Sequence, residues 1–414
     1  MTDSPIALDR NVPNALDAAH LLSDVRTLSE AIGPRPPTSA AERQAAAYIA
    51  EQLRPLAEDW HMRNQPFRSI SAMSTRIAPL AVAVGASLLL GRRHARWAQL
   101  LGGALSVGLS VASRDVFLSR PVAWEAFLPR GTSQNVIVRI PPRSRRTRRV
   151  VFLAHMDSGQ HRLTANRHLV NHLPQTLGAL TLLALVGGVL TMLAGKSAQR
   201  WRTLRTLIAG GSFGSAALAV LDELGKPVNG AICNASGVAA LLGLARALHA
   251  RPLTSTEVVL AFTGSATAVS TGAEALAHEY HEEWGDALWV VVSNVGAGEL
   301  CWVTQHGISP YAMYAPDPLA VRVMERVADA RPDLGLMGKR LVTLDELARL
   351  RDHDLHAVAL MGYDRVSGLI PHWRQRSDTL AALQSPTIER AAHACWTVTQ
   401  VLDQAESWPL PARA

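Results

Sequence analysis

Short and long apolar runs lie along this chain, and each kind predicts a different element. Short runs rich in β-branched residues predict buried strands at 136–140, 150–154, 258–264, 290–292 and 358–364. Apolar residues at helical spacing predict helices at 236–250, 274–284 and 386–403. Strands that alternate with helices are typical of an α/β fold, so we predict a three-layer sandwich with helices on both faces of a mixed, mostly parallel sheet. The Arg-rich segment 141–149 is expected to join the first two strands as a hairpin.

Four longer runs are uncharged and apolar, and they come in pairs, at 77–91 with 97–113 and at 176–195 with 206–220. A membrane span needs roughly 20 residues, with about 17 as the usual floor. The third run qualifies, the second is adequate, and the first and fourth are short. Their Gly, Ala and Ser content suits close helix packing in lipid. We therefore predict a multi-pass integral membrane protein: one α/β domain over 1–414, interrupted by membrane hairpins at 77–113 and 176–220. The alternative is four buried helices of a soluble domain.

Two signals disagree on which side of the membrane the α/β domain lies. The connectors 92–96 and 196–205 are basic, and the positive-inside rule places such connectors in the cytoplasm and the α/β domain outside. The first 17 residues show no signal peptide, which favours a cytoplasmic α/β domain. The sequence leaves both arrangements open.

Composition narrows the classes of partner. The net charge is +7 and nearly all basic residues are Arg, since lysine occurs only at 196, 226 and 339. These residues are not interleaved with aromatic residues, so no nucleic-acid partner is expected. Membrane lipid is the expected partner, with the Arg cluster at 143–149 either contacting headgroups or forming a solvated turn. The wide spacing of Cys233, Cys301 and Cys395 excludes a disulfide scaffold and a CxxC-type structural zinc site.

A chemical motif follows the strand at 150–154. His155-Met156-Asp157 stands at its end, and a His-x-Asp pair can present a metal-binding imidazole held by a carboxylate. Further motifs follow, at 229–242 (NGAICNASGVAALL), 262–264 (FTG), 294–296 (NVG) and 373–379 (WRQRSDT). Together with segment 19–56, these motifs resemble the co-catalytic zinc aminopeptidases. That family also contains glutaminyl cyclases and the non-enzymatic transferrin receptor ectodomain.

The resemblance implies five metal-ligand positions and a general base. His155 matches the first zinc ligand, and Asp157 matches the residue that orients it. The other positions differ from the family: they hold Cys233 for the bridging Asp, Ala266 and Thr267 for a Glu-Glu pair, Ser293 for an Asp, and Arg374 for the last His. A one-residue shift in register would supply His372 as that last ligand. Since one ligand of five survives and Arg374 carries a fixed positive charge, we expect no metal cofactor.

Three functions fit these positions. The first is a membrane-embedded pseudopeptidase, a binding or scaffold protein for an anionic or peptide-like ligand, with a protein partner or an active related subunit. Its expected substrate-binding residues are Thr267, Ser293, Asn294, His372 and Arg374. The second is a metal-independent hydrolase, acyl- or aminoacyl-transfer or cyclising enzyme with Cys233 as nucleophile, His155 as base and Asp157 as orienting residue. The third, which the family resemblance alone favours, is a divergent zinc aminopeptidase.

Overall fold

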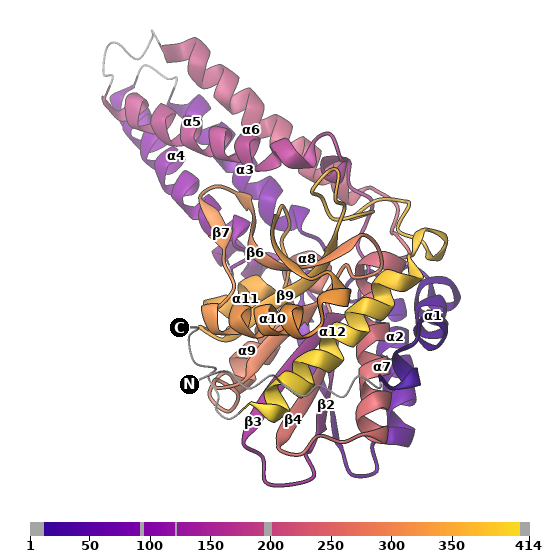
Figure 1. Cartoon of the computed structure of the whole chain (residues 1–414). Helices are drawn as coiled ribbons and strands as arrows, with labels where there is room; N and C mark the ends of the chain where they lie inside the picture. The colour runs from indigo at the N-terminus through magenta and orange to yellow at the C-terminus, as the bar shows by residue number, and fades with distance from the viewer. Residues whose placement is uncertain (1–11, 92–94, 121, 194–200, 406–414) are drawn as a thin grey trace.

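A nine-stranded mixed sheet forms the centre of the α/β domain in the computed structural model, which describes residues 12–91, 95–120, 122–193 and 201–405 (Figure 1). The strand order is β1-β2-β4-β3-β5-β9-β6-β7, with β8 paired to β6. Neighbouring strands are parallel from β4 to β9, whereas β1, β2, β6 and β7 join by antiparallel pairing. The strands are β1 (His61–Ser69), β2 (Gly131–Ile140), β3 (Arg148–His155), β4 (Thr256–Thr263), β5 (Leu288–Val292), β6 (Glu299–Ser309), β7 (Ala312–Tyr314), β8 (Met337–Leu341) and β9 (His356–Tyr363).

Helices cover both faces of this sheet, which confirms the predicted three-layer fold. Side chains along β3 alternate between two cores, so that Phe152 belongs to one and Leu153 to the other. The first core is covered by α1 (Ala18–Arg26), α2 (Ala40–Leu53), α7 (Ser236–Ala250), α10 (Pro318–Ala330) and α12 (Ser385–Gln404), and the second by α9 (Thr271–Tyr280) and α11 (Leu347–Asp352).

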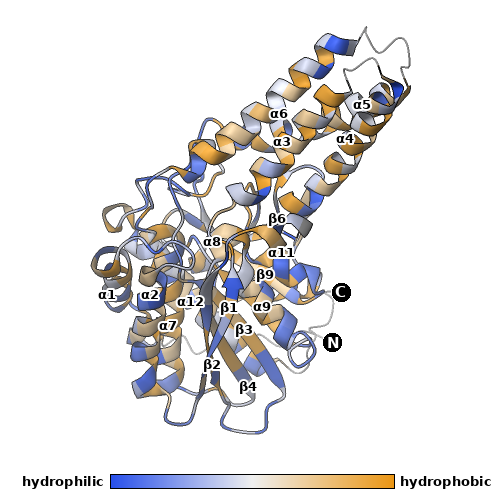
Figure 2. Ribbon diagram, turned by 180° about the vertical axis from the view of Figure 1, so that it is seen from behind, coloured by the Kyte–Doolittle hydropathy of each residue, from blue (hydrophilic) through white to orange (hydrophobic). Residues whose placement is uncertain are grey.

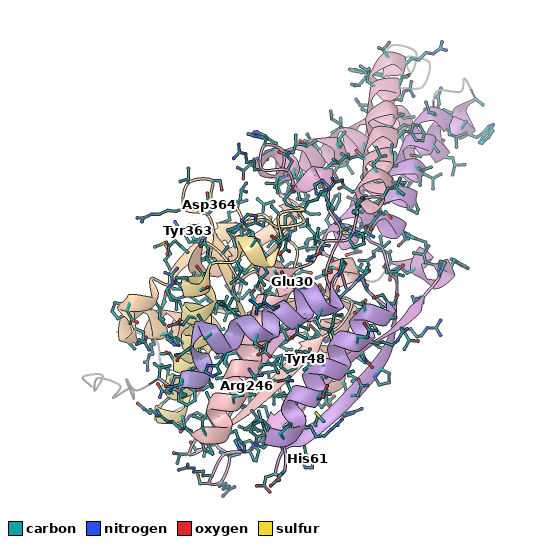
Figure 3. The ribbon with its side chains drawn as sticks, turned by 90° about the vertical axis from the view of Figure 1, so that its right-hand side faces the viewer. Glu30, Tyr48, His61, Arg246, Tyr363 and Asp364 are labelled. Carbon is teal, nitrogen blue, oxygen red and sulfur yellow. The ribbon has the colours of Figure 1, made fainter. Side chains whose placement is uncertain are left out.

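A buried ionic cluster ties the first helix layer together. Asp24 of α1 accepts a hydrogen bond of 2.7 Å from the hydroxyl of Tyr48 on α2. It also forms an ion pair of 2.6 Å with Arg246 on α7. Figure 3 shows Tyr48 and Arg246 on these neighbouring helices. The cluster fixes α1, α2 and α7 against one another beside the strand ends.

The predicted hairpin between 136–140 and 150–154 is wrong. β2 and β3 do not pair, because β4 lies between them and bonds to both. All residues of β4 are buried, so its backbone groups and both its faces need partners on either side. Residues 131–135 extend β2 along β1, ahead of the strand predicted at 136–140.

The four apolar runs form a helical bundle that projects from the α/β domain (Figures 1 and 2). Its helices are α3 (Ser74–Leu90), α4 (Arg96–Phe117), α5 (Leu173–Leu193) and α6 (Arg202–Glu223). Helices α4, α5 with its preceding turn, and α6 are long and apolar enough to cross a membrane, and α3 is shorter. The segment 231–250, which contains α7, also meets that criterion, but 89% of it is buried within the α/β domain. Of the basic connectors 92–96 and 196–205, residues 92–94 and 196–200 lie outside the described residues.

The bundle helices approach closely where small residues face each other. Gly103 of α4 lies against the backbone carbonyl of Gly188 on α5, and a Cβ built on Gly103 would stand 2.6 Å from that oxygen. Nearby, the hydroxyl of Ser106 donates to the carbonyl of Ala184 at 2.9 Å. Such contacts are typical of helices that pack in lipid.

The base of the bundle rests on the sheet. Met73 directly precedes α3, and Phe117 is the last residue of α4. Both pack in one apolar cluster with Ile308 of β6 and Tyr314 of β7. Leu177 of α5 is packed against the same cluster. These contacts place the bundle above the carboxyl ends of the parallel strands.

Candidate functional site

A pocket lies at the carboxyl ends of the parallel strands, where α/β folds place their sites. It collects most of the residues that the sequence motifs single out: His155, Cys233, Ala266, Thr267, Ser293, Asn294 and Arg374. His372 does not line this pocket. Its ring Nδ1 lies 2.8 Å from the hydroxyl of Ser377, so the one-residue shift in register gains no support from the geometry.

Local backbone geometry brings Cys233 to the strand ends. Gly230 adopts the left-handed conformation, with φ of 66°, and starts the tight turn Ala231–Ala235. The carbonyl of Cys233 accepts a 2.7 Å hydrogen bond from the main-chain N–H of Asn294. The turn is therefore fastened directly to the end of β5.

His155 and Asp157 are close, and the carboxylate of Asp157 is fully buried. The His155 Nδ1 lies 3.0 Å from the main-chain oxygen of Asp157 and 3.5 Å from its carboxylate. Burial opposes the charge on both groups. Their mutual attraction outweighs it, so the pKa of His155 is raised and that of Asp157 is lowered. The pair therefore favours a charged imidazole and an ionised carboxylate.

The carboxylate of Asp157 is also held by the short helix α8 (Ala266–Val269). Its Oδ1 accepts from the N–H of Ala266 at 2.9 Å, and its Oδ2 accepts from the N–H of Thr267 at 2.8 Å and from the Thr267 hydroxyl at 2.5 Å. Both carboxylate oxygens thus have protein donors from the two positions at which the resemblance implies a Glu-Glu pair.

Cys233 lies beside a second buried carboxylate. Asp378, from the Ser-Asp-Thr motif, accepts from the N–H of Ile232 at 2.7 Å and faces the Cys233 thiol. Burial first, and the charge of Asp378 second, raise the pKa of that thiol well above its usual range. Among the described residues, no hydrogen bond joins Cys233 to His155. The thiol is accordingly protonated at neutral pH.

Arg374 closes one side of the pocket. Its Nη2 donates to the main-chain oxygen of Thr267 at 2.9 Å. Its guanidinium rests on Gly159, where a Cβ would stand 2.0 Å from Nη1. Burial lowers the pKa of Arg374 to about 10, so it stays charged at neutral pH. It forms no ion pair with a residue that the structure describes.

Sequence reasoning missed two acids that line the pocket. Asp345 and Glu346 precede α11 and come from a segment outside the recognised motifs. Glu346 is buried, and its Oε1 accepts from the Thr263 hydroxyl at 2.5 Å. Burial raises the pKa of Glu346 to about 7, with His155 opposing the shift. The signal in the sequence was an adjacent acidic pair directly after the apolar segment 341–344.

Comparison with known proteins finds relatives by structure alone. No protein-family model matches the chain, and no curated protein matches its sequence. An aminopeptidase from Aneurinibacillus sp. strain AM-1 superposes with a TM-score of 0.57 at 15% identity, over 95% of this chain and 96% of its own. A glutaminyl cyclase from Bacteroides thetaiotaomicron, solved with N-acetylhistamine, superposes with a TM-score of 0.55 at 15% identity, over 94% of this chain and 98% of its own. A zinc aminopeptidase from Bacillus subtilis superposes with a TM-score of 0.54 at 13% identity, over 94% of this chain and 96% of its own. The chain has the zinc aminopeptidase and glutaminyl cyclase fold. This agrees with the resemblance in the motifs.

The residues present in this aminopeptidase-like pocket do not fit a di-zinc centre. Zinc sites bring together several His, Cys or carboxylate ligands within a few ångström. Among the described residues, one group of three such side chains has its ligand atoms within 4.8 Å of one another. It lies outside the pocket, on the outer helix layer, and consists of Asp17, Glu389 and His393. The pocket holds His155, Cys233, Asp345, Glu346 and Asp378, but no three of these described residues bring their ligand atoms within 4.8 Å of one another. Ala266, Thr267 and Ser293 supply no carboxylate.

Proposed function

We propose that this chain is a pseudopeptidase: a membrane-embedded protein that uses the aminopeptidase-like pocket to bind a ligand without a di-zinc centre. The observation that carries the proposal is the bonding of Asp157. Both of its carboxylate oxygens accept from α8, at Ala266 and Thr267, in the place where the resemblance implies the general base and a metal ligand. The carboxylate of Asp157 is therefore satisfied from within the protein.

The charge balance supports the same conclusion. Two zinc ions bring four positive charges, which buried carboxylates must offset, because unpaired buried charge is very costly. Here Cys233, Ala266, Thr267 and Ser293 take the four acidic positions, and Arg374 adds a further positive charge. Zinc placed among these residues would face a cation where the family has a neutral ligand.

The alternative function is an enzyme in which the Cys233 thiol is the nucleophile, assisted by His155 and Asp157. It requires a thiolate or a base within hydrogen-bonding reach of the thiol. The raised pKa of Cys233 and its placement beside Asp378 weigh against it. A divergent zinc aminopeptidase is the remaining alternative, and the pocket residues weigh against that one.

Zinc content tests the proposal. The detergent-purified protein is incubated with zinc, desalted, and measured by inductively coupled plasma mass spectrometry. Because the surface group at Asp17, Glu389 and His393 can take up zinc on its own, the measurement uses the His393→Ala variant. We expect far less than one zinc per chain. Near-stoichiometric zinc in this variant would overturn the proposal and favour a divergent zinc aminopeptidase.

A positive control shows that the assay can detect a rebuilt centre. It restores the family residues in the same background, with Cys233→Asp, Ala266→Glu, Thr267→Glu, Ser293→Asp and Arg374→His. We expect this variant to retain more zinc than its parent, since the restored side chains return the missing ligands to the strand ends.

A further inference from the structure

Three cavities follow one another from the strand ends into the bundle. The first is the site pocket described above. The second, the base chamber, lies between the sheet and the bundle and shares Leu344, Trp373 and Arg374 with the site pocket; its volume is about 1000 Å³, with the open space at its mouth included. The third, the bundle chamber, shares Ile77, Phe117, Leu177, Leu180 and Ser215 with the base chamber and has a volume of about 520 Å³, counted in the same way. The shared residues place the three cavities next to one another, and we call this row of cavities the path.

The two outer cavities are mostly apolar. Side chains such as Met73, Ile77, Phe117, Leu177, Leu218 and Ile308 line the base chamber, together with the charged Arg162, Asp222 and Glu223. The bundle chamber continues along α3 from Ile77 to Val84, about 10 Å at the rise of a helix. Apolar cavities do not hold water well and accept apolar guests. A long, narrow apolar path that ends in a bundle of membrane-spanning character fits a hydrocarbon chain.

The far end of the path, in the site pocket, offers unused hydrogen-bond acceptors. Four pocket side chains each have a buried oxygen without a partner among the described residues: Asn294 Oδ1, Asp345 Oδ2, Glu346 Oε2 and Asp378 Oδ2. Each of these side chains is more than nine-tenths buried. A buried acceptor without a donor is costly, so the pocket is suited to a ligand group that brings several N–H donors and a positive charge.

A single cation stands at the boundary between the polar and apolar parts. Arg374 lines both the site pocket and the base chamber. The neighbouring charge of Arg162 is already paired, since its Nη2 lies 2.9 Å from Glu223. Among the described residues, the Arg374 guanidinium donates to the main-chain oxygen of Thr267 and to no other acceptor, so it is available to an anionic group of the ligand.

The order of these features defines one class of ligand. We propose that the site binds a single-chain lipid amphiphile, with its hydrocarbon chain in the base and bundle chambers, an anionic group at Arg374, and a primary ammonium at Asn294, Glu346 and Asp378. A phosphoethanolamine head attached to one acyl chain presents these groups in that order. This inference deepens the proposed function and rests on it, because the ammonium occupies the pocket in which the zinc enzymes hold metal.

Lipid binding is measured on the full chain by native mass spectrometry from a sterol-based detergent. The probes are lysophosphatidylethanolamine, lysophosphatidylglycerol and lysophosphatidylcholine with the same acyl chain. The glycerol head has no ammonium, and the choline head has no N–H donor. We expect the ethanolamine lipid to bind about tenfold more tightly than either, because only its ammonium satisfies the unpaired acceptors. Equal binding of the three lipids would overturn the proposal.

Two variants locate the head and the chain separately. Glu346→Gln keeps the shape of the side chain and removes its charge, so it should reduce ethanolamine-lipid binding and leave glycerol-lipid binding unchanged. Ala219→Trp fills the base chamber and should abolish binding of all three lipids. Its matched control is Ala217→Trp, exposed on the same helix and outside the chamber lining, which should bind like the parent. Retention of lipid by Ala219→Trp contradicts the assigned path.

Zinc content of the same preparation separates this inference from the proposed function. A zinc-free chain that binds none of the lipids overturns the amphiphile proposal and leaves the metal-free binding protein standing. A chain with stoichiometric zinc in the site pocket overturns the proposed function, and the ammonium site with it.

Discussion

Thr267 donates both its main-chain N–H and its hydroxyl to Oδ2 of Asp157, at 2.8 and 2.5 Å. The resemblance to zinc aminopeptidases implies a Glu at this position. Thr267 therefore donates to the carboxylate of Asp157, which by the resemblance orients a metal-binding histidine. The fold keeps this carboxylate in place, and Thr267 binds it directly.

Removal of the Thr267 hydroxyl should destabilise the protein. Thr267→Val keeps the shape of the side chain but leaves Asp157 without its shortest hydrogen bond. Since a hydrogen bond to a buried charged group contributes about 2 kcal/mol, we expect a lower midpoint of thermal unfolding. The exposed Thr254→Val is the matched control and should unfold like the parent. Equal midpoints for the two variants would mean that the hydroxyl contributes nothing to stability.

Cys233 should react slowly with iodoacetamide at neutral pH. The thiolate is the reactive form, and burial and Asp378 keep the thiol protonated by raising its pKa. Cys301 and Cys395 are fully buried, so mass spectrometry of the folded protein reports on Cys233, with Cys233→Ala as the blank. We expect labelling slower than that of a free cysteine and a rate that rises steeply with pH. Labelling faster than free cysteine would instead support the thiol triad with His155 and Asp157.

The ionisation of Glu346 should make stability fall as pH rises. Its pKa is about 7 in the folded protein against an ordinary value of 4.5. The folded state thus holds the proton more tightly, and this contribution to stability is complete below pH 4.5 and lost as pH rises through 7. Each pKa unit corresponds to about 1.4 kcal/mol, so the loss is at most about 3 to 4 kcal/mol.

The variant Glu346→Gln cannot ionise but can still accept from Thr263. We therefore expect its unfolding midpoint to exceed that of the parent at pH 8 and to match it near pH 4. Differential scanning fluorimetry at both values checks this, with Glu58→Gln, an exposed position, as control. A midpoint below that of the parent at pH 8 would show that the ionised carboxylate stabilises the folded state.

The motifs predicted much of the fold and part of the site, for a physical reason. His155, Cys233 and Ser293 stand at the ends of buried strands or in the turn beside them, and parallel strands bring their carboxyl ends to one edge of the sheet. The family resemblance of the motifs, together with their positions at strand ends, was enough to place them together. The apolar runs likewise predicted the bundle helices, because length and hydropathy alone define such segments.

The rest depended on contacts between distant segments. Glu346 reaches the pocket because α11 packs against β9 and α9, which brings its preceding residue to Thr263 at the end of β4. No periodicity in the sequence reports that contact. The false hairpin at 141–149 has the same origin. A short connection between two strands that are consecutive in the sequence predicts a hairpin. The prediction fails here because a later strand, β4, lies between the two.

Close packing of the bundle should be sensitive to side-chain size at Gly103. A larger residue there meets the carbonyl of Gly188 and the side chain of Met192, and since the carbonyl belongs to the backbone, α4 and α5 must move apart. We expect Gly103→Leu to cost about 2 kcal/mol and to lower both the unfolding midpoint and the yield of monodisperse protein. Gly108→Leu is the control on the same helix, because no atom lies within 4 Å of a Cβ at that position. Size-exclusion chromatography and thermal unfolding in detergent compare the two. If Gly103→Leu behaves like Gly108→Leu, the two helices do not cross at these glycines, and the bundle chamber loses the packing that shapes it.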